Sequence, residues 1–383
     1  MKLVFITGSL VHGGAERHSI TLVNRLAERG HECHAVYVKN DPSQLGRLRG
    51  AASVRCLEAQ RYLDFAALNR LSGFLGELNP DVVVSANPYA LMYGWAAARL
   101  ARLRVPLAVT FHTTVPRDAK EWLKLAYYRP LFWNADCAVF VCGAQRRYWQ
   151  RRGLWGRRNE VIYNGVDTDT WRSQPAERAA LRRALGYSDG DFVIGLSAVL
   201  RREKNPLQLV DALAALRRRG IPARALFIGD GEMRPALEAR ARSAGVAGEV
   251  LVSGLQSDVR PLVSACDAMT LCSTSIETFS LAALESMALG RPVVHAELGG
   301  AAEMIRPGHD GWLFPVGDTG ALVERLAALA DPAERARMGA NARDSAEARF
   351  SERTMVERYE ITLQELALKR SSSESLRRSA TAH

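Results

Sequence analysis

The chain has 383 residues, of which 48% are hydrophobic and 24% are charged, and its formal net charge is +10. This length and apolar content exceed one ordinary core, so we expect two domains that each bury a full sheet. No run of about 18 uncharged apolar residues occurs, and Met1-Lys2 leads directly into a strand-like segment, so we expect a cytosolic protein with neither a transmembrane helix nor a secretory signal.

The positive charge is concentrated in the first part of the chain. Residues 1–165 have 23 Lys+Arg against 12 Asp+Glu, and the remainder has 28 against 29. These arginines are scattered without the interleaved aromatic residues of a nucleic-acid site, so no nucleic-acid partner is predicted. Peripheral contact with an anionic membrane, where each basic residue contributes about 1 kcal/mol, is one interpretation. An ordinary solvated basic face is the other.

Six cysteines stand at positions 33, 56, 137, 142, 266 and 272. They form no CxxC pair and no zinc spacing, and most have apolar, strand-like neighbours. Reduced core thiols are therefore expected, and no metal site follows from them.

The first half alternates strands and helices and predicts a Rossmann-like domain. Its strand-like segments are 2–9, 32–38, 81–86, 106–112, 137–142 and 159–163. After the first of them, Gly13 and Gly14 open a helix and permit close approach of backbone to a ligand, although the GxGxxG pattern is absent. His112 ends the fourth strand, at the carboxyl edge where α/β sites form.

The segment 161–171 (VIYNGVDTDTW) predicts a link between two domains. Asp167 and Asp169 form a DxD pattern, which occurs in the metal sites of some enzymes. Because Asn164-Gly165 precede them, we interpret the aspartates as turn chemistry at a hinge, not as metal ligands.

The second half predicts another Rossmann-like domain. Its strand-like segments are 192–198, 224–229, 250–253, 268–272, 292–296 and 312–315. The basic segment 200–206 (LRREKNP) follows the first of these strands. A helical pattern at 352–368 precedes a polar, Ser/Arg-rich tail, 369–383, for which disorder is expected.

Two acids flank the start of a helix in the segment 273–294 (STSIETFSLAALESMALGRPVV). Glu277 lies in the turn after a buried strand, and Ser280 is a candidate N-cap, so the amides of Phe279, Ser280 and Leu281 form a candidate anion site. Glu285 lies one turn further and suits hydroxyl groups better than phosphate. The alternative is that both glutamates are solvated surface charges.

This segment resembles the glutamate-x7-glutamate motif of retaining nucleotide-sugar glycosyltransferases with the GT-B fold, family four type. The resemblance extends over about residues 3–365 and includes Gly13-Gly14, His112, the link and Lys204. It implies two Rossmann-like domains facing each other across a cleft: an N-terminal acceptor domain, 1–166, packed by the helix 352–368, and a C-terminal donor domain, 167–351.

The resemblance also assigns roles within the donor domain. Glu285 would bind the ribose hydroxyls and Glu277 the transferred sugar, while Lys204 and the 279–281 amides would hold the diphosphate. The family's phosphate arginine is replaced by Val199, so Arg201 or Arg202 would substitute for it. Gly254-Leu255 would border the nucleobase. Thr278 and Ser280 stand where the family has glycines and would narrow the space for the sugar.

In the N-terminal domain, the resemblance implies that Gly13-Gly14 face the diphosphate and that His112 contacts the sugar. The expected enzyme is a retaining, metal-independent glycosyltransferase without cofactor, acting from a nucleotide-sugar, UDP favoured over GDP, on a glycan or lipid-linked acceptor of cell-surface polysaccharide or lipopolysaccharide. Glu277 is either a nucleophile or a positioning group. A phosphorylase or epimerase of the same fold and a non-catalytic binding protein remain the alternatives.

Overall fold

The structure, a computed structural model, describes residues 1–11, 13–112, 119–275 and 277–381. It divides into two compact units. Unit 1 comprises Met1–Tyr163 and Met355–His383, and unit 2 comprises Asn164–Thr354. Among the described residues, no helix is both long enough and apolar enough to cross a bilayer.

Unit 1 contains, within its described residues, a parallel sheet of seven strands in the order β3-β2-β1-β4-β5-β6-β7. The strands are β1 (Lys2–Thr7), β2 (Glu32–Tyr37), β3 (Ser53–Cys56), β4 (Val82–Ala86), β5 (Leu107–Phe111), β6 (Cys137–Phe140) and β7 (Arg158–Val161). The helices are α1 (Gly14–Glu28), α2 (Phe65–Leu78), α3 (Asn87–Leu100), α4 (Ala119–Trp133), α5 (Gly143–Gln150) and α14 (Glu352–Thr381), with a 3₁₀ turn at Leu45–Arg47.

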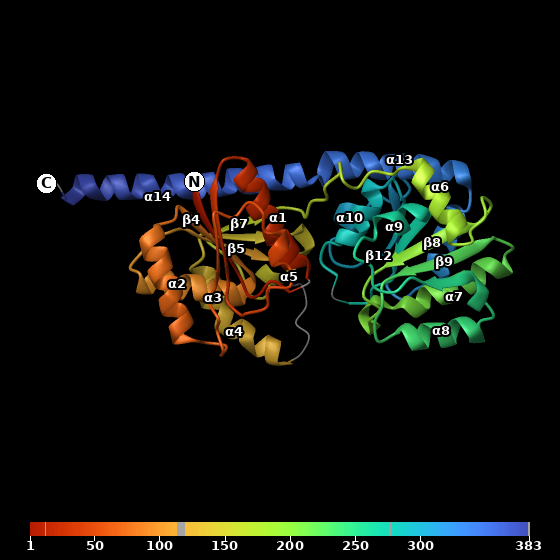
Figure 1. Ribbon diagram of the computed structural model, residues 1–383, viewed down its shortest axis with the longest axis horizontal. Helices are drawn as coiled ribbons and strands as arrows, with labels where there is room; N and C mark the ends of the chain where they lie inside the picture. The colour runs from red at the N-terminus through yellow and green to blue at the C-terminus, as the bar shows by residue number, and fades with distance from the viewer. Residues whose placement is uncertain (12, 113–118, 276, 382–383) are drawn as a thin grey trace. The chain divides into compact units, whose positions relative to one another are not determined.

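The two faces of this sheet are covered by different helices, because successive strand residues point to opposite sides. Val4 and Ile6 of β1 pack in one cluster with apolar residues of α2, α3 and α4. Leu3 and Phe5 pack on the other face with residues of α1 and α14, including Tyr359. In Figure 1, α14 runs along one side of the sheet and α2, α3 and α4 lie on the other.

Unit 2 contains a parallel sheet of six strands, in the order β10-β9-β8-β11-β12-β13, among its described residues. The strands are β8 (Phe192–Ser197), β9 (Ala223–Ile228), β10 (Val250–Val252), β11 (Ala268–Leu271), β12 (Val293–Ala296) and β13 (Gly311–Phe314). The helices are α6 (Pro175–Ala184), α7 (Pro206–Arg218), α8 (Arg234–Ser243), α9 (Arg260–Ala265), α10 (Leu281–Ala288), α11 (Ala301–Met304), α12 (Thr319–Ala328) and α13 (Pro332–Arg349), with 3₁₀ turns at Arg202–Lys204 and Ala247–Glu249.

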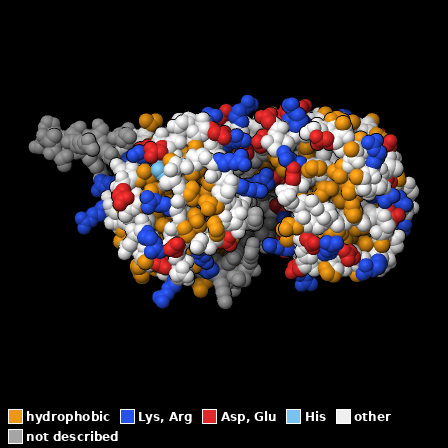
Figure 2. Space-filling model, viewed as in Figure 1, with side chains coloured by type: hydrophobic (Ala, Val, Ile, Leu, Met, Phe, Trp, Pro, Cys, Tyr) orange, Lys and Arg blue, Asp and Glu red, His pale blue; other side chains and the backbone are white. Residues whose placement is uncertain are grey.

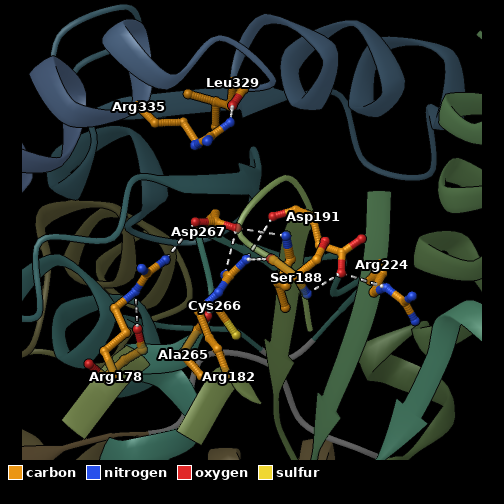
Figure 3. A network of polar contacts seen from close by, with 12 residues as sticks. Arg178, Arg182, Ser188, Asp191, Arg224, Ala265, Cys266, Asp267, Leu329 and Arg335 are labelled. Carbon is orange, nitrogen blue, oxygen red and sulfur yellow. Dashed lines mark hydrogen bonds and ion pairs between the residues drawn. The ribbon is translucent and has the colours of Figure 1, made fainter. Parts of the chain in front are cut away.

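A polar network fixes β11 against β8 at the amino ends of these strands (Figure 3). Asp267, just before β11, accepts hydrogen bonds from the backbone N–H of Val193 (2.8 Å) and from the guanidinium groups of Arg178 (2.6 Å) and Arg182 (3.0 Å). The side chain of Arg182 also donates to the backbone carbonyls of Ser188 and Ala265. Satisfying a buried acid in this way stabilises the strand that leads into residues 272–280.

The predicted fold class, two parallel-sheet Rossmann-like domains, is confirmed. The short edge strand β3 was not predicted, because its four residues are largely exposed and carry no apolar run. The units divide at Tyr163/Asn164 and Thr354/Met355, where the sequence placed boundaries at 166 and 351. Helix α14 continues to Thr381, so the expected disorder of the tail from residue 369 differs from the structure.

The cysteines are free thiols, five of them buried, as the sequence predicted. Burial raises the pKa of Cys266 and Cys272 to about 12, which makes these thiols unreactive at neutral pH. On the face drawn in Figure 2, Lys and Arg side chains are interspersed with acidic and apolar ones on both units.

Candidate functional site

In unit 1, the predicted residues lie at the carboxyl edge of the sheet, where β1, β4 and β5 are neighbours. Gly13 is the N-cap of α1, and Gly14 is the first helical residue, as expected from the glycine pair. A Cβ at Gly13 would lie 2.3 Å from a carboxylate oxygen of Glu16, so this acid lies directly over the turn. Burial raises the pKa of the Glu16 carboxyl.

His112 immediately follows β5 at the same edge. Its backbone N–H donates to Oδ1 of Asn87 (3.1 Å), the residue that begins α3 after β4. Its ring lies edge-on to the ring of His18, with centroids 4.6 Å apart. Burial lowers the pKa of His112 to about 4, so the imidazole is neutral at pH 7. A neutral ring can exchange hydrogen bonds with hydroxyl groups but cannot neutralise a phosphate.

His18 was missed by sequence reasoning. It lies on the buried face of α1, 6% exposed, between His112 and Tyr359, whose ring centroid is 5.3 Å away. Burial, and secondarily the adjacent His112, lower its pKa well below the ordinary value. Among the described residues, neither ring nitrogen of His18 has a hydrogen-bond partner. A histidine one turn after the glycine pair is the signal that could have identified it.

In unit 2, the segment after β11 leads into α10 as predicted. The hydroxyl oxygen of Ser280, the N-cap, accepts a hydrogen bond from the N–H of Ala283 (3.3 Å). Helix α10 begins at Leu281 and ends before Gly290. The first-turn amides therefore form a helix N-terminus in the place where the sequence predicted an anion site.

Lys204 and Glu277 are in direct contact. Nζ of Lys204, in the 3₁₀ turn after β8, lies 2.6 Å from Oε2 of Glu277, and the hydroxyl of Ser273 donates to the same oxygen (3.1 Å). The side chains of Lys204 and Glu277 are 26% and 11% exposed. The sequence predicted both as site residues but did not predict their ion pair.

Glu285 lies on α10 and is 6% exposed. A buried carboxylate requires polar partners, because removing it from water costs several kcal/mol. The side chain of Glu277 is 11% exposed and paired with Lys204, so neither acid is a freely solvated surface charge, which was the alternative.

The turn between the two acids is held by residues that sequence reasoning did not assign to the site. Nδ2 of Asn164 donates to the carbonyl of Phe279 (3.1 Å), and the N–H of Gly300 donates to the carbonyl of Thr278 (2.7 Å). Gly299 has φ +60°, and a Cβ there would lie 2.0 Å from the carbonyl oxygen of Glu277. The adjacent Gly299-Gly300 pair after a buried strand was the available signal.

The remaining predicted donor residues lie on neighbouring loops of unit 2. Gly254 forms a bridge with Gly229, and Leu255 beside it is 85% exposed. The side chain of Arg201 is 52% exposed and lies 3.9 Å from Glu203. Arg202 is exposed too.

The DxD pair of the link has the geometry of a turn. Oδ1 of Asp167 accepts from the N–H groups of Asp169 and Thr170 (3.1 Å each), and Oδ2 accepts from the Thr170 hydroxyl (2.8 Å). This agrees with the interpretation of Asp167 as turn chemistry. Over the part of the chain that the structure describes, no three His, Cys, Asp or Glu side chains form a cluster suited to a metal ion.

Unit 2 therefore combines an ammonium group, a helix N-terminus and two shielded carboxylates at the carboxyl ends of β8 and β11. An ammonium group and a helix N-terminus can bind phosphate oxygens, and carboxylates can accept hydrogen bonds from sugar hydroxyls. Such a set suits a ligand that has both phosphate and sugar parts.

Two family models match the chain. Residues 12–170 match the model described as Glycosyltransferase Family 4, and residues 177–345 match the model described as Glycosyl transferases group 1. The matches fall on the two halves that the sequence assigned to two domains.

Relatives and solved structures agree with these models. The lipopolysaccharide core biosynthesis glycosyltransferase LpsE of Rhizobium meliloti is 29% identical over 350 residues, which cover 91% of this chain and 94% of LpsE. The phosphatidyl-myo-inositol mannosyltransferase of Mycobacterium leprae is 26% identical over 328 residues, 83% and 84% of the two chains. HepE of Anabaena in complex with UDP superposes with a TM-score of 0.86 at 25% identity, over 95% of this chain and all of HepE; HepE has also been solved with UDP-glucose.

Proposed function

Because the chain belongs to the GT-B glycosyltransferases of group 1, an assignment that rests on both family models and on the fold, we propose that it transfers a sugar from UDP to a glycan or lipid-linked acceptor with retention of the anomeric configuration. The chain is a transferase of the glycosyl-transferring class. The observation that carries the finer proposal is the contact of Lys204 with Glu277 in unit 2.

The donor is proposed to bind in unit 2. Lys204 and the first-turn amides of α10 would hold the diphosphate, because an ammonium and a helix N-terminus both attract phosphate oxygens. Glu285, buried on the same helix, would accept hydrogen bonds from the ribose hydroxyls. UDP as the carrier is supported by the similarity to HepE, which has been solved in complex with UDP and with UDP-glucose.

The transfer breaks the bond between the anomeric carbon and the diphosphate oxygen and forms a bond from that carbon to an acceptor oxygen. The acceptor proton passes to the departing diphosphate. Lys204 would stabilise the charge that grows on the leaving group, the electrostatic contribution that dominates many such reactions. Glu277 would orient the sugar or act as nucleophile, and neutral His112 would hold a sugar hydroxyl.

Metal independence is part of this proposal, since cationic side chains and amides would neutralise the diphosphate instead of a divalent ion. Turnover that is unchanged by EDTA supports it, and turnover that EDTA abolishes and Mg²⁺ or Mn²⁺ restores contradicts it.

The acceptor is proposed to belong to lipopolysaccharide or another cell-surface polysaccharide. The similarity to LpsE, whose name states lipopolysaccharide core biosynthesis, supports this class, and the mannosyltransferase named for phosphatidyl-myo-inositol supports a lipid-linked acceptor. A location on the cytoplasmic side of the membrane, with the enzyme peripherally attached, would bring it to such an acceptor.

A thermal-shift screen with nucleoside diphosphates tests the donor assignment. A ligand at 100 times its Kd stabilises the folded state by about 2.7 kcal/mol, so UDP should raise the melting temperature and GDP should raise it less. The Lys204→Ala variant should lose the shift. A GDP shift larger than the UDP shift would overturn the choice of UDP.

Incubation with UDP-sugars tests the reaction class. Slow release of free sugar and UDP, accelerated by an acceptor, is expected of a transferase. Interconversion of UDP-sugars without acceptor would indicate an epimerase, and sugar phosphate formed from glycan and phosphate would indicate a phosphorylase. The anomeric configuration of the product, read by proton NMR, decides retention.

A further inference from the structure

The peptide group that joins Phe111 to His112 is held at both ends by side chains. Its N–H, which belongs to His112, donates to Oδ1 of Asn87 (3.1 Å). Its carbonyl, which belongs to Phe111, accepts a hydrogen bond from Nε2 of Gln145 (2.9 Å). The backbone that carries the His112 ring is therefore fixed by two carboxamides from different segments of unit 1.

The carboxamide of Asn87 continues the sheet beyond the point where its strands end. The last paired residues of β4 and β5 are Ala86 and Thr110. After Ala86 the chain turns into α3, so no strand carbonyl follows to receive the N–H of His112. A backbone N–H in such a place needs an acceptor, and Oδ1 of Asn87 supplies it.

Gln145 acts in the same way on the other side of β5. Its side chain is buried in α5, and its Oε1 accepts from the N–H of Val141 (2.9 Å), the residue that follows β6. Because its Nε2 donates to Phe111, one carboxamide bridges the ends of β5 and β6. Buried polar groups that are satisfied in this way hold the backbone in one arrangement.

The backbone of Asn87 is strained. Its φ is +68°, in the left-handed region. Asparagine enters this region more readily than most residues with side chains, but glycine does so without steric cost. Strain of this kind is concentrated at functional sites, where the surroundings enforce it. What asparagine offers over glycine at this position is the oxygen that binds the N–H of His112.

The ring of His112 is confined as well. The ring of His18 lies edge-on to it, with centroids 4.6 Å apart, and the ring of Tyr359 packs against His18 with centroids 5.3 Å apart. Burial lowers the pKa of both histidines, so at pH 7 the two imidazoles are neutral and do not repel each other. His112 is therefore fixed through its backbone by Asn87 and through its ring by His18.

We propose that Asn87 is a positioning residue of the transfer reaction, which acts by holding the backbone of His112. This role rests on the contact of His112 with the sugar proposed above. Displacement of a group at the reacting centre by about 1 Å can lower the rate about 100-fold, so the loss of the hydrogen bond from His112 to Asn87 would reduce turnover. Binding of the nucleotide would not change, because Asn87 belongs to unit 1 and the donor is proposed to bind in unit 2.

Asn87→Gly tests the proposal, because it removes the carboxamide and glycine accepts the left-handed backbone. The variant should keep a melting temperature close to that of the wild type, since relief of the strain offsets the lost hydrogen bond. It should keep its KM for the UDP-sugar and lose kcat about 10- to 100-fold. Asn87→Asp retains an acceptor oxygen in a residue that tolerates the left-handed region, and it should restore most of kcat.

Asn79→Gly is the matched control. Asn79 also precedes a proline and also has a positive φ, +46°, but it is the C-cap of α2, and its Oδ1 accepts a hydrogen bond from Arg370. This variant should keep the kcat of the wild type. A loss of kcat in Asn79→Gly as large as that in Asn87→Gly would mean that any change at a left-handed asparagine lowers turnover, which overturns the proposal.

The combined variant Asn87→Gly/His112→Gln distinguishes positioning from a purely structural role. If Asn87 acts through His112, its loss costs nothing more once the imidazole is gone, so kcat should equal that of His112→Gln alone. Losses that multiply, or a wild-type kcat in Asn87→Gly beside a reduced kcat in His112→Gln, overturn the proposal. A wild-type kcat in His112→Gln overturns instead the role of His112 in the proposed function, so the two failures are distinguishable.

Discussion

Lys204 and Glu277 form an ion pair whose atoms Nζ and Oε2 are 2.6 Å apart. The side chain proposed to bind the diphosphate and the side chain proposed to bind the sugar therefore neutralise each other before a donor binds. A diphosphate that enters must compete with Glu277 for the ammonium group. In the proposed donor complex, Lys204 would turn to the phosphate and leave the carboxylate of Glu277 to the sugar. The pair would then couple the binding of the two halves of the donor.

Lys204→Ala should lower UDP affinity about 10- to 100-fold, because a charge-assisted hydrogen bond contributes on the order of 1.5–3 kcal/mol. Titration calorimetry with UDP measures this loss of affinity. Arg219→Ala is the control. Arg219 is an exposed cation at the C-terminal end of α7, far along the helix from Lys204, and it pairs with Glu324 of α12. This variant should bind UDP normally. Equal losses in both variants would mean that the effect is long-range charge and not a contact.

Glu277→Gln should separate binding from turnover. Removing the negative charge frees Lys204, so UDP affinity should stay constant or rise several-fold, while transfer to acceptor falls by about 100-fold or more if the carboxylate acts on the sugar in the transition state. Calorimetry and initial rates on the same preparation check it. A loss of UDP affinity as large as that of Lys204→Ala would contradict the competition between phosphate and Glu277.

Glu285→Ala should weaken binding of UDP, and the loss should depend on the ribose. With a UDP analogue that lacks both ribose hydroxyls, the variant and the wild type should bind with the same affinity, because the interaction is already absent. The four affinities form a double-mutant cycle. Additive losses from the variant and from the analogue would place the Glu285 contact elsewhere on the nucleotide.

Lowering the pH should destabilise the protein through the adjacent histidines His18 and His112. The pKa of His112 is about 4 in the folded state, against about 6.5 when unfolded. Above pH 6.5 both states are neutral and the histidine contributes nothing. As the pH falls toward 4, the unfolded chain binds the proton first, so the free energy of unfolding drops by roughly 1–3 kcal/mol. His18, shifted in the same direction, adds to this loss, and Tyr359, packed against it, stays protonated because burial raises its pKa.

Urea unfolding midpoints at pH 7.5, 5.5 and 4.5 measure this effect. The dependence of the unfolding midpoint on pH should flatten in His112→Gln. His112→Gln should also retain UDP affinity, because His112 belongs to unit 1 and UDP is proposed to bind in unit 2. The variant should lose transferase turnover. An identical slope in the wild type and in His112→Gln would show that His112 is not buried as a neutral ring.

Gly299→Ala should damage the site more than the fold alone explains. Its Cβ would meet the carbonyl oxygen of Glu277 at 2.0 Å, so the turn between the two acids must move. Gly220→Ala is a matched control, because φ there is +77° and nothing lies within 4 Å of the added Cβ. Both variants should lose about 1 kcal/mol or more of stability from the left-handed backbone, but only Gly299→Ala should lose UDP-sugar turnover.

Sequence patterns predicted the architecture well, because the buried strands of both sheets are short apolar runs followed by helix starts. The N-cap at Ser280 was predictable because a hydroxyl side chain stands directly before apolar residues spaced as in a helix. Contacts between segments distant in sequence were not predictable. Asn164 was interpreted only as turn chemistry, yet its side chain holds the carbonyl of Phe279, 115 positions away.

The continuation of α14 beyond residue 368 could not be predicted either. Ser, Arg and Glu after that position carry no apolar period, and the sequence therefore indicated disorder, but α14 continues. The ion pair of Lys204 with Glu277 was likewise hidden, because motif reasoning assigns each residue to a ligand and not to another residue of the site.

The place of α14 in unit 1 has a consequence for protein synthesis. Tyr359 and Leu363 complete the core on the face of Leu3 and Phe5, but the ribosome makes them only after all of unit 2. Domains generally fold in the order in which they emerge. Here the unit that is begun first cannot complete the burial of one face of its sheet until the unit begun second has been finished, because α1 covers only part of that face. During that interval the nascent chain exposes an apolar face, which makes it a candidate client for chaperones.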